Sequence, residues 1–189
     1  MQRIAEIISA ATRLPLLAVP LFLLVGVEDA GWRGCLWAFL CLFLTSGLSL
    51  IYLVYLSRSG KVRDHRKISQ GERVRPLRVV AGLYAGALIL VTLLGAPTPL
   101  RAVLLSYTLA TSTFAVLTPL TNLSLHTAGV SGALVCLLYV FGGWGLLFAP
   151  VLPIVWWARC SLGRHTHLEL FLGVLVGGGF TWFSFHLMV

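Results

Sequence analysis

One short segment combines a guanidinium, an imidazole and a carboxylate at spacings that suit phosphate chemistry. Arg159 is followed after five residues by His165 and after three more by Glu169. We expect His165 and Glu169 to lie at the start of a helix, where residues four apart share a face and can touch. A carboxylate bonded to one imidazole nitrogen fixes the tautomer and raises the basicity of the other, as a nucleophilic histidine requires. Arg159 and Arg164 offer paired donors that match phosphate oxygens.

A second histidine, His126, is expected at the first turn of another helix, with Ser124 as its candidate N-cap. The free N–H groups and the positive dipole end of a helix N-terminus attract anions. A histidine at this position can donate a proton to a leaving oxygen. The sequence therefore contains two separable histidines with different chemical tasks.

A third segment, residues 61–76, is a basic loop that ends at Pro76. Clustered Lys and Arg beside membrane helices attract anionic headgroups and phosphates. Most charges of this loop are interpreted as the ordinary juxtamembrane signal of membrane proteins. Lys67, Arg73 and Arg75 are the candidates for binding a phosphate.

The rest of the chain is strongly apolar. Of 189 residues, 58% are hydrophobic and 11% are charged, whereas soluble domains carry roughly 25% charged residues. No Asp, Glu, Lys or Arg occurs in residues 34–57, 79–100, 102–158 or 170–189. A bilayer crossing needs about 20 apolar residues, so the composition excludes a soluble globule, a disordered chain and a disulfide scaffold, and indicates a polytopic membrane protein.

We predict a single all-α domain over residues 1–189, built as a bundle of six or seven transmembrane helices. The expected helices lie near 8–27, 34–57, 77–95, 101–121, 127–143, 146–162 and 168–188. This alternation returns the motif segments near 61–76, 122–129 and 158–169 to one membrane face, as a single active site requires. Every Lys and Arg except Arg33 and Arg101 lies on that face, which the positive-inside rule makes cytoplasmic. The net charge of +8 is interpreted as attraction to lipid headgroups or phosphates rather than to nucleic acid.

Together the three segments resemble the type 2 phosphatidic acid phosphatases, a superfamily of lipid phosphate phosphatases whose signature reads K-x6-R-P, P-S-G-H and S-R-x5-H-x3-D. The third part matches in spacing at Arg159, His165 and Glu169, with Glu in place of Asp and Ala158 in place of Ser. The second part retains Ser124 and His126. The first part matches only in residue types, as Lys67 followed by Arg75-Pro76, or only in spacing, as Arg66 and Arg73.

The resemblance implies hydrolysis of a polyprenyl phosphate or diphosphate, or of a phosphatidate-like lipid, without a metal or other cofactor. His165 would form a phosphohistidine, oriented by Glu169, and His126 would protonate the leaving oxygen. The phosphate would be held by Lys67, Arg73, Arg75, Arg159 and Ser124. The expected partners are the lipid phosphate and the bilayer, and the oligomeric state stays open.

Three alternatives use the same residues. A phosphotransferase would pass the phosphoryl or headgroup to an alcohol instead of water. A binder or flippase would hold the headgroup with the cations and would not need the pairing of His165 with Glu169. A metal site with His126, His165 and His167 needs an extended stretch, because residues two apart on a helix point about 200° apart.

Overall fold

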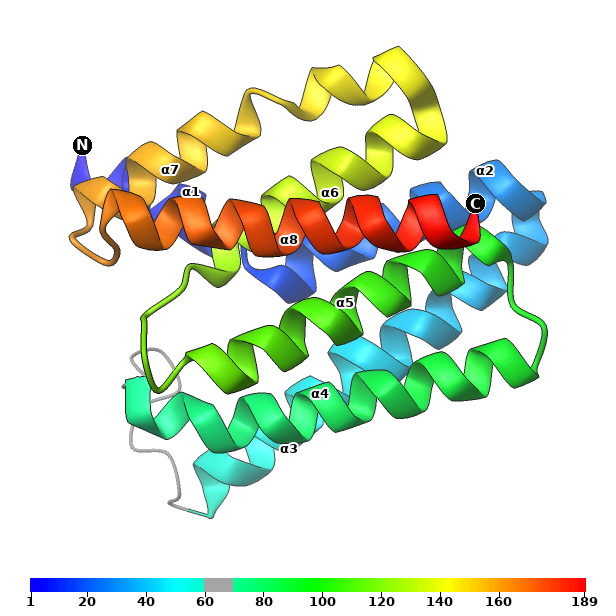
Figure 1. The fold of residues 1–189 in the computed structure, drawn as a ribbon, viewed down its shortest axis with the longest axis horizontal. Coiled ribbons are helices and arrows are strands. Elements are labelled where there is room, and N and C mark those ends of the chain that lie inside the picture. The colour runs from blue at the N-terminus through cyan, green and yellow to red at the C-terminus, as the bar shows by residue number, and fades with distance from the viewer. Residues whose placement is uncertain (60–69) are drawn as a thin grey trace.

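The computed structural model describes residues 1–59 and 70–189, and within these ranges it contains helices and no strand (Figure 1). The elements are α1 (Gln2–Ala11), α2 (Leu14–Leu42), the π-helical η1 (Phe43–Gly47), α3 (Leu48–Arg58), α4 (Gln70–Leu93), α5 (Thr98–Leu117), α6 (Leu125–Phe141), the 3-10 segment η2 (Gly142–Phe148), α7 (Val151–Ser161) and α8 (His167–Met188). The predicted all-α class is therefore confirmed for the described residues.

Among the described residues, five helical segments are long and apolar enough to cross a bilayer: Leu14–Arg58, Arg73–Leu93, Thr98–Leu117, Leu125–Phe148 and His167–Met188. Together with the composition, these segments identify a membrane protein. Helix α7 is not among them, because its 11 residues rise only about 16 Å. It begins at Val151, after Pro150, and not near residue 146 as predicted, because the 3-10 segment η2 occupies Gly142–Phe148.

The 45-residue segment Leu14–Arg58 reverses direction near its middle (Figure 1). Ala30 and Gly31 leave the helical conformation there, and Gly31 adopts a positive φ of 56°, which glycine tolerates because it lacks a Cβ. Gly26 and Gly34 then face each other so closely that a Cβ on either residue would collide with the other's backbone. The two halves therefore form a helical hairpin.

The beginning of the chain differs from the predicted helix at 8–27. Helix α1 ends at Ala11, and α2 begins at Leu14 after an extended Arg13 with φ −65° and ψ 138°. Pro15 sits at the start of α2, where its fixed φ suits the first helical turn and its missing N–H costs no bond. The break yields a separate short helix before the first apolar segment.

Helices α6 and α8 pack closely along their length. A Cβ on Gly173 would approach the Ser124 carbonyl oxygen to 2.6 Å, and one on Gly177 would collide with the backbone of Ala128. This approach allows the Thr127 hydroxyl on α6 to donate to the Leu170 carbonyl on α8 at 3.0 Å. The first turns of α6 and α8, which carry the two histidine motifs, are thus fixed to each other.

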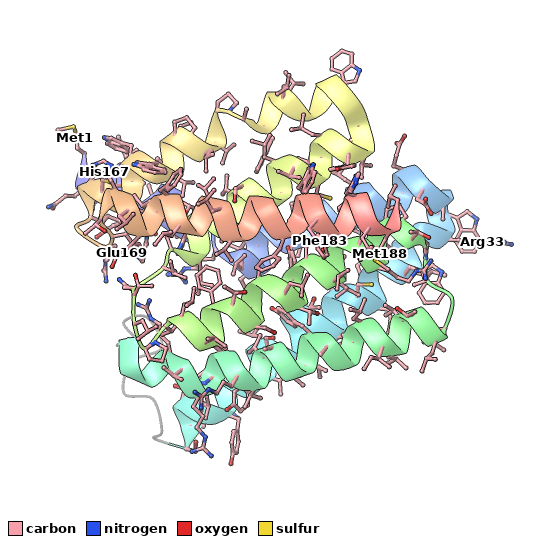
Figure 2. All side chains as sticks on the ribbon, in the orientation of Figure 1. Met1, Arg33, His167, Glu169, Phe183 and Met188 are labelled. Carbon is pink, nitrogen blue, oxygen red and sulfur yellow. The ribbon has the colours of Figure 1, made fainter. Side chains whose placement is uncertain are left out.

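The described parts of the three motif segments lie at one end of the bundle. Figure 2 shows Met1, His167 and Glu169 at that end, with Arg33 and Met188 at the opposite end. Hydrogen bonds join Arg73, Asn122 and the segment that precedes α8. Residues 70–76, 122–129 and 158–169 therefore lie together at one end of the bundle, although residues 70–76 belong to α4 and not to the predicted loop. Lys67 lies outside the described residues.

Candidate active site

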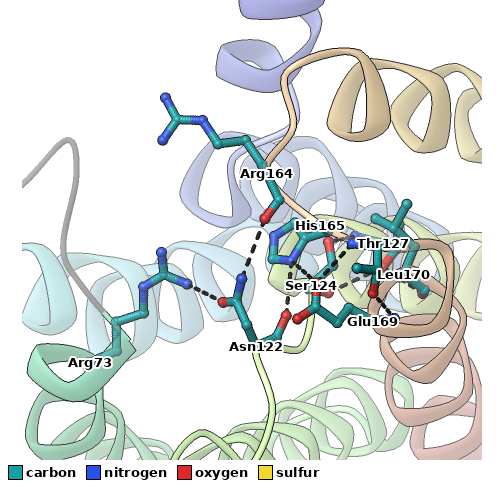
Figure 3. Close-up of polar contacts among 9 residues, drawn as sticks. Arg73, Asn122, Ser124, Thr127, Arg164, His165, Glu169 and Leu170 are labelled. Carbon is teal, nitrogen blue, oxygen red and sulfur yellow. Dashed lines mark hydrogen bonds and ion pairs between the residues drawn. The ribbon is translucent and has the colours of Figure 1, made fainter.

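His165 is held through one ring nitrogen. Its Nδ1 lies 2.9 Å from the carbonyl oxygen of Asn122 and 3.5 Å from Oε2 of Glu169 (Figure 3). A carbonyl oxygen can only accept, so Nδ1 carries the proton in the neutral ring and Nε2 carries the lone pair. With a side chain only 3% exposed, His165 is fixed in the tautomer that a nucleophilic Nε2 requires.

Glu169 has a second task that the sequence reasoning missed. Its Oε2 accepts from the backbone N–H of Thr166 at 2.8 Å, and the Thr166 hydroxyl accepts from the Glu169 N–H at 3.3 Å. This is a capping box, for which the T-x-x-E pattern is the sequence signal. Helix α8 therefore begins at His167, and His165 lies just before the helix rather than in its first turn.

Asn122 is the residue that joins the three segments, and sequence reasoning did not single it out. Its Oδ1 accepts from Nη1 of Arg73 at 3.0 Å, and its Nδ2 donates to the carbonyl oxygen of Arg164 at 3.3 Å. Its own carbonyl holds His165. Figure 3 shows Arg73 reaching Asn122 from α4, while the Arg164 side chain extends away. A single asparagine in the α5–α6 connection gave no motif by which to recognise it.

His126 is also held by a backbone carbonyl, but through the other ring nitrogen. The Ser124 side chain caps α6 by accepting from the Thr127 N–H at 3.4 Å, as predicted, and places His126 in the first turn. Nε2 of His126 lies 3.1 Å from the carbonyl oxygen of Ser9. By the same reasoning as for His165, Nε2 carries the proton and Nδ1 is left to accept or transfer one.

The two histidines share one electrostatic neighbourhood with the arginines. The charges of His126 and His165 interact with each other and with Arg159. Arg159 in turn repels Arg73 and Arg164. Nη1 of Arg159 donates to the Ser9 hydroxyl at 2.7 Å. Converging positive charges repel one another, so an anion placed among them would gain attraction from several sources at once.

This environment lowers the pKa of His165. Burial is the largest cause, since it disfavours the charged imidazolium, and the positive charge of Arg159 acts in the same direction. The Asn122 carbonyl and the Glu169 carboxylate oppose the shift. His165 is therefore neutral, and its Nε2 able to attack, at pH values where an ordinary histidine would be protonated.

Two other predicted phosphate-binding residues lie differently from Arg73. Arg75 is exposed on α4, and two residues along a helix turn a side chain by about 200°, so it points away from the direction of Arg73. Ser124 is fully buried, and its hydroxyl oxygen caps the helix. The structure thus brings together His126, His165, Glu169, Arg73 and Arg159.

His167 does not join the other two histidines. Its Nδ1 accepts from Nε1 of Trp156 on α7 at 2.9 Å, which turns the ring toward that helix. Among the described residues, no group of three or more His, Cys, Asp or Glu side chains is placed to hold a metal ion.

A cavity of about 90 Å³ lies in the bundle near the first turn of α6. Leu125 and Gly129, which flank His126 on α6, contribute to its wall, as does Leu14 at the start of α2. Most of the lining is apolar, and the cavity extends to Leu50, whose side chain is exposed on the outer surface of the bundle. The lining of the cavity thus runs from the first turn of α6 to that outer surface.

Comparison with known proteins gives no relative from which a function could be transferred: no protein-family model matches the chain, and neither a curated protein nor a solved structure is significantly similar to it.

Proposed function

We propose that this protein is an integral-membrane lipid phosphatase that hydrolyses a polyprenyl phosphate or diphosphate, or a phosphatidate-like lipid, through a phosphohistidine and without a metal ion. The observation that carries the proposal is the arrangement around His165. Its Nδ1 is bound to a carbonyl oxygen, which leaves the lone pair on Nε2, and positive charges converge on the same ring. A buried neutral imidazole beside fixed cations is suited to attack a phosphate.

In the first step, Nε2 of His165 attacks phosphorus and the bond from phosphorus to the leaving oxygen breaks. His126 starts the cycle as the doubly protonated imidazolium and gives that oxygen the proton of Nδ1, which leaves a neutral ring with its proton on Nε2. The lipid leaves as an alcohol, or as a monophosphate when the substrate is a diphosphate. In the second step, His126 accepts a proton from water through the same nitrogen. The water oxygen attacks phosphorus, the P–N bond breaks, and inorganic phosphate is released.

The cations supply binding and charge stabilisation in this scheme. Arg159 and Arg73 hold the non-bridging oxygens, whose negative charge persists through both steps. The resemblance also assigns phosphate binding to Lys67, Arg75 and Ser124, but Arg75 points away from Arg73 and the buried Ser124 hydroxyl caps α6, so the proposed binding of the phosphate rests on Arg159 and Arg73. Glu169 orients His165 and favours the imidazolium that exists transiently during phosphoryl transfer.

The cavity near the first turn of α6 supports the proposal that the substrate is a lipid. Its walls are mainly apolar and it reaches the exposed side of the bundle at Leu50. An acyl or prenyl tail placed there would bury apolar surface while its phosphate lies at the histidines. The same route would let the substrate enter sideways without leaving the bilayer.

We propose six or seven membrane crossings with the site on the cytoplasmic face. The hairpin at Gly31 makes two crossings of the first apolar segment, which with the other four segments gives six. Helix α7, 11 residues long, is too short to cross the bilayer alone, so the return through η2 and α7 to the site end is the partial crossing that separates six from seven. Because Arg33 and Arg101 are the only basic residues in the sequence assigned to the other face, the positive-inside rule favours a cytoplasmic site.

The test is release of inorganic phosphate by the purified full chain in detergent, with a chelator present. A polyprenyl diphosphate, a polyprenyl monophosphate and a phosphatidate are compared, each with the wild-type protein, His165→Ala and the matched control His167→Ala. We expect release that survives the chelator, persists in His167→Ala and disappears in His165→Ala, with melting temperature confirming that both variants fold.

Other results would redirect the proposal. Release that the chelator abolishes would contradict the metal-independent mechanism. Release that needs an added alcohol acceptor would indicate a phosphotransferase. Absence of release from all three lipids would contradict the phosphatase, and retention of lipid-phosphate binding by His165→Arg would then identify a binder.

A further inference from the structure

Helix α1 contributes to the site although it lies outside all three motif segments. It packs against α7 at the end of the bundle where the histidines lie (Figure 1). Ala5 is completely buried, whereas Ile4 and Ile7 are 56% and 67% exposed. The helix thus has one face docked on the protein and an apolar stripe that the described residues leave uncovered.

Ser9, near the end of α1, contacts both His126 and Arg159. Its carbonyl oxygen lies 3.1 Å from Nε2 of His126, and its hydroxyl accepts from Nη1 of Arg159 at 2.7 Å. These residues are 117 and 150 positions away from Ser9 in the sequence. One residue therefore fixes two of the groups to which the proposed reaction gives chemical tasks.

We propose that Ser9 is a positioning residue and that α1 is an interfacial helix that completes the active site; this inference rests on the proposed function. The Ser9 carbonyl keeps the proton of His126 on Nε2 and thereby leaves Nδ1 to exchange protons with the lipid oxygen and with water. The Ser9 hydroxyl accepts a hydrogen bond from Nη1 of Arg159. The remaining N–H groups of the Arg159 guanidinium therefore keep a fixed direction toward the phosphate.

The bilayer explains why α1 stays in this position. Thr12 closes the helix by donating its hydroxyl to the carbonyl of Ile8 at 2.8 Å, and only Arg13 separates this end from the apolar segment that begins at Leu14. Helix α1 must therefore lie at the boundary of the membrane. An amphipathic helix there buries apolar side chains among lipid headgroups and acyl chains, a role suited to Ile4 and Ile7.

The hydroxyl contact is tested with Ser9→Ala and Ser9→Thr. Ser9→Ala removes the acceptor for Arg159 and retains the backbone carbonyl at His126, so we expect kcat for lipid phosphate release to fall about 10-fold. Ser9→Thr restores a hydroxyl and should recover most of that loss. A merely structural role would instead lower the melting temperature of Ser9→Ala without a change in kcat, and that result would overturn the proposal.

The carbonyl contact is tested by displacing α1 with Ala5→Arg, because a charge cannot be buried against α7 without a partner. Gln2→Arg makes the same charge change on an exposed position and is the matched control. Imidazole ¹⁵N NMR of the full chain in lipid nanodiscs, with the His126 signals assigned by comparison with His126→Gln, reads the tautomer directly. We expect His126 to be protonated on Nε2 in wild type and Gln2→Arg, and to exchange between tautomers in Ala5→Arg.

This NMR measurement separates the present inference from the proposed function, since it needs no turnover. An unchanged tautomer in Ala5→Arg, or a wild-type His126 protonated on Nδ1, would overturn the positioning role even if the protein is a phosphatase. A protein without phosphatase activity whose His126 tautomer depends on α1 would contradict the proposed reaction but retain the contact.

Discussion

The two ends of the bundle differ in the contacts that their arginine and histidine side chains make. At the end opposite the site, three such side chains interact with a near neighbour in sequence. Arg33 lies over the ring of Trp32 at 5.8 Å, Arg101 donates to the Thr98 hydroxyl at 2.7 Å, and His186 stacks on Trp182 with centroids 5.2 Å apart. Such contacts form within a single helix or turn.

At the site end, several polar contacts join residues that are far apart in the chain, beside local ones such as that of His165 with Glu169. Arg73 and Asn122 are 49 positions apart, and His165 and Asn122 are 43 apart. Each end contains one arginine whose buried Nε has no acceptor among the described residues: Arg101 at one end and Arg159 at the other. Such an unpaired donor therefore does not distinguish the two ends. The two ends therefore differ in the sequence separation of the residues that their polar contacts join. Contacts between distant residues bring groups from several helices to one place, as the proposed binding of one lipid phosphate requires.

The largest contrast is expected between the histidines of the two ends. His126→Ala removes the proposed proton donor and acceptor and should lower kcat by about 10²- to 10⁴-fold. His186→Ala removes only a stacked ring and should change kcat less than about twofold. Phosphate release from the best lipid substrate measures both, and equal losses in the two variants would contradict the distinction between the ends.

The arginines give the next contrast. Arg159→Gln should lower kcat/KM by about 10²- to 10³-fold, as expected when a donor to transition-state charge is lost, while Arg101→Gln should change it little. Removing Arg159 also removes a positive charge that lowers the pKa of His165. That pKa should therefore rise, and the acid limb of kcat/KM should move to higher pH. An acid limb that stays in place in Arg159→Gln would show that the two groups are not coupled.

Asn122→Ala tests whether the connection between the three segments matters. The variant keeps the backbone carbonyl that holds His165 but removes the side chain that joins Arg73 to the carbonyl of Arg164. Loss of these bonds should reduce kcat/KM about 10-fold, with most of the effect on KM because Arg73 is proposed to bind the phosphate. Thr98→Ala, which frees Arg101 at the other end, is the matched control. If Asn122→Ala lowers the melting temperature but leaves kcat/KM unchanged, the Asn122 side chain has only a structural role and this prediction is wrong.

Glu169→Gln should have the smallest effect. Glutamine retains the acceptor of the capping box, so α8 should begin as before and kcat should fall no more than about fivefold. The negative charge that favours protonation of His165 is lost, which lowers its pKa further. The acid limb of kcat/KM should therefore move to lower pH, opposite to Arg159→Gln, and movement in the same direction in both variants would refute this electrostatic description.

The sequence was sufficient to predict the class of fold and the grouping of the motif segments. Runs without charge reveal helices in a bilayer, because each apolar crossing has a minimum length. The alternation of crossings then determines which connections share a face. The spacing of His165 and Glu169 likewise predicted their contact, which has a length of 3.5 Å.

The contacts through backbone carbonyls could not be predicted in this way. A carbonyl oxygen is present at every residue, so nothing in the types of Ser9 and Asn122 indicates that their main chains hold His126 and His165. Those contacts depend on how α1 and the α5–α6 connection pack. Glu169 contacts both His165 and the Thr166 N–H. The second contact could have been predicted, because the capping-box pattern of Thr166 and Glu169 is local in the sequence.

The account's central claim is that Nε2 of His165 becomes covalently phosphorylated. The direct measurement is rapid mixing of His126→Ala with an aryl phosphate, whose good leaving group does not need a proton donor, followed by an alkaline quench and mass spectrometry. Because Nδ1 of His165 is bound to the Asn122 carbonyl and breakdown lacks its base, the account predicts accumulation of a phosphohistidine at His165, substituted at Nε2. Phosphate release in a single turnover with no phosphorylated His165, or with substitution at Nδ1 or another residue, would contradict it.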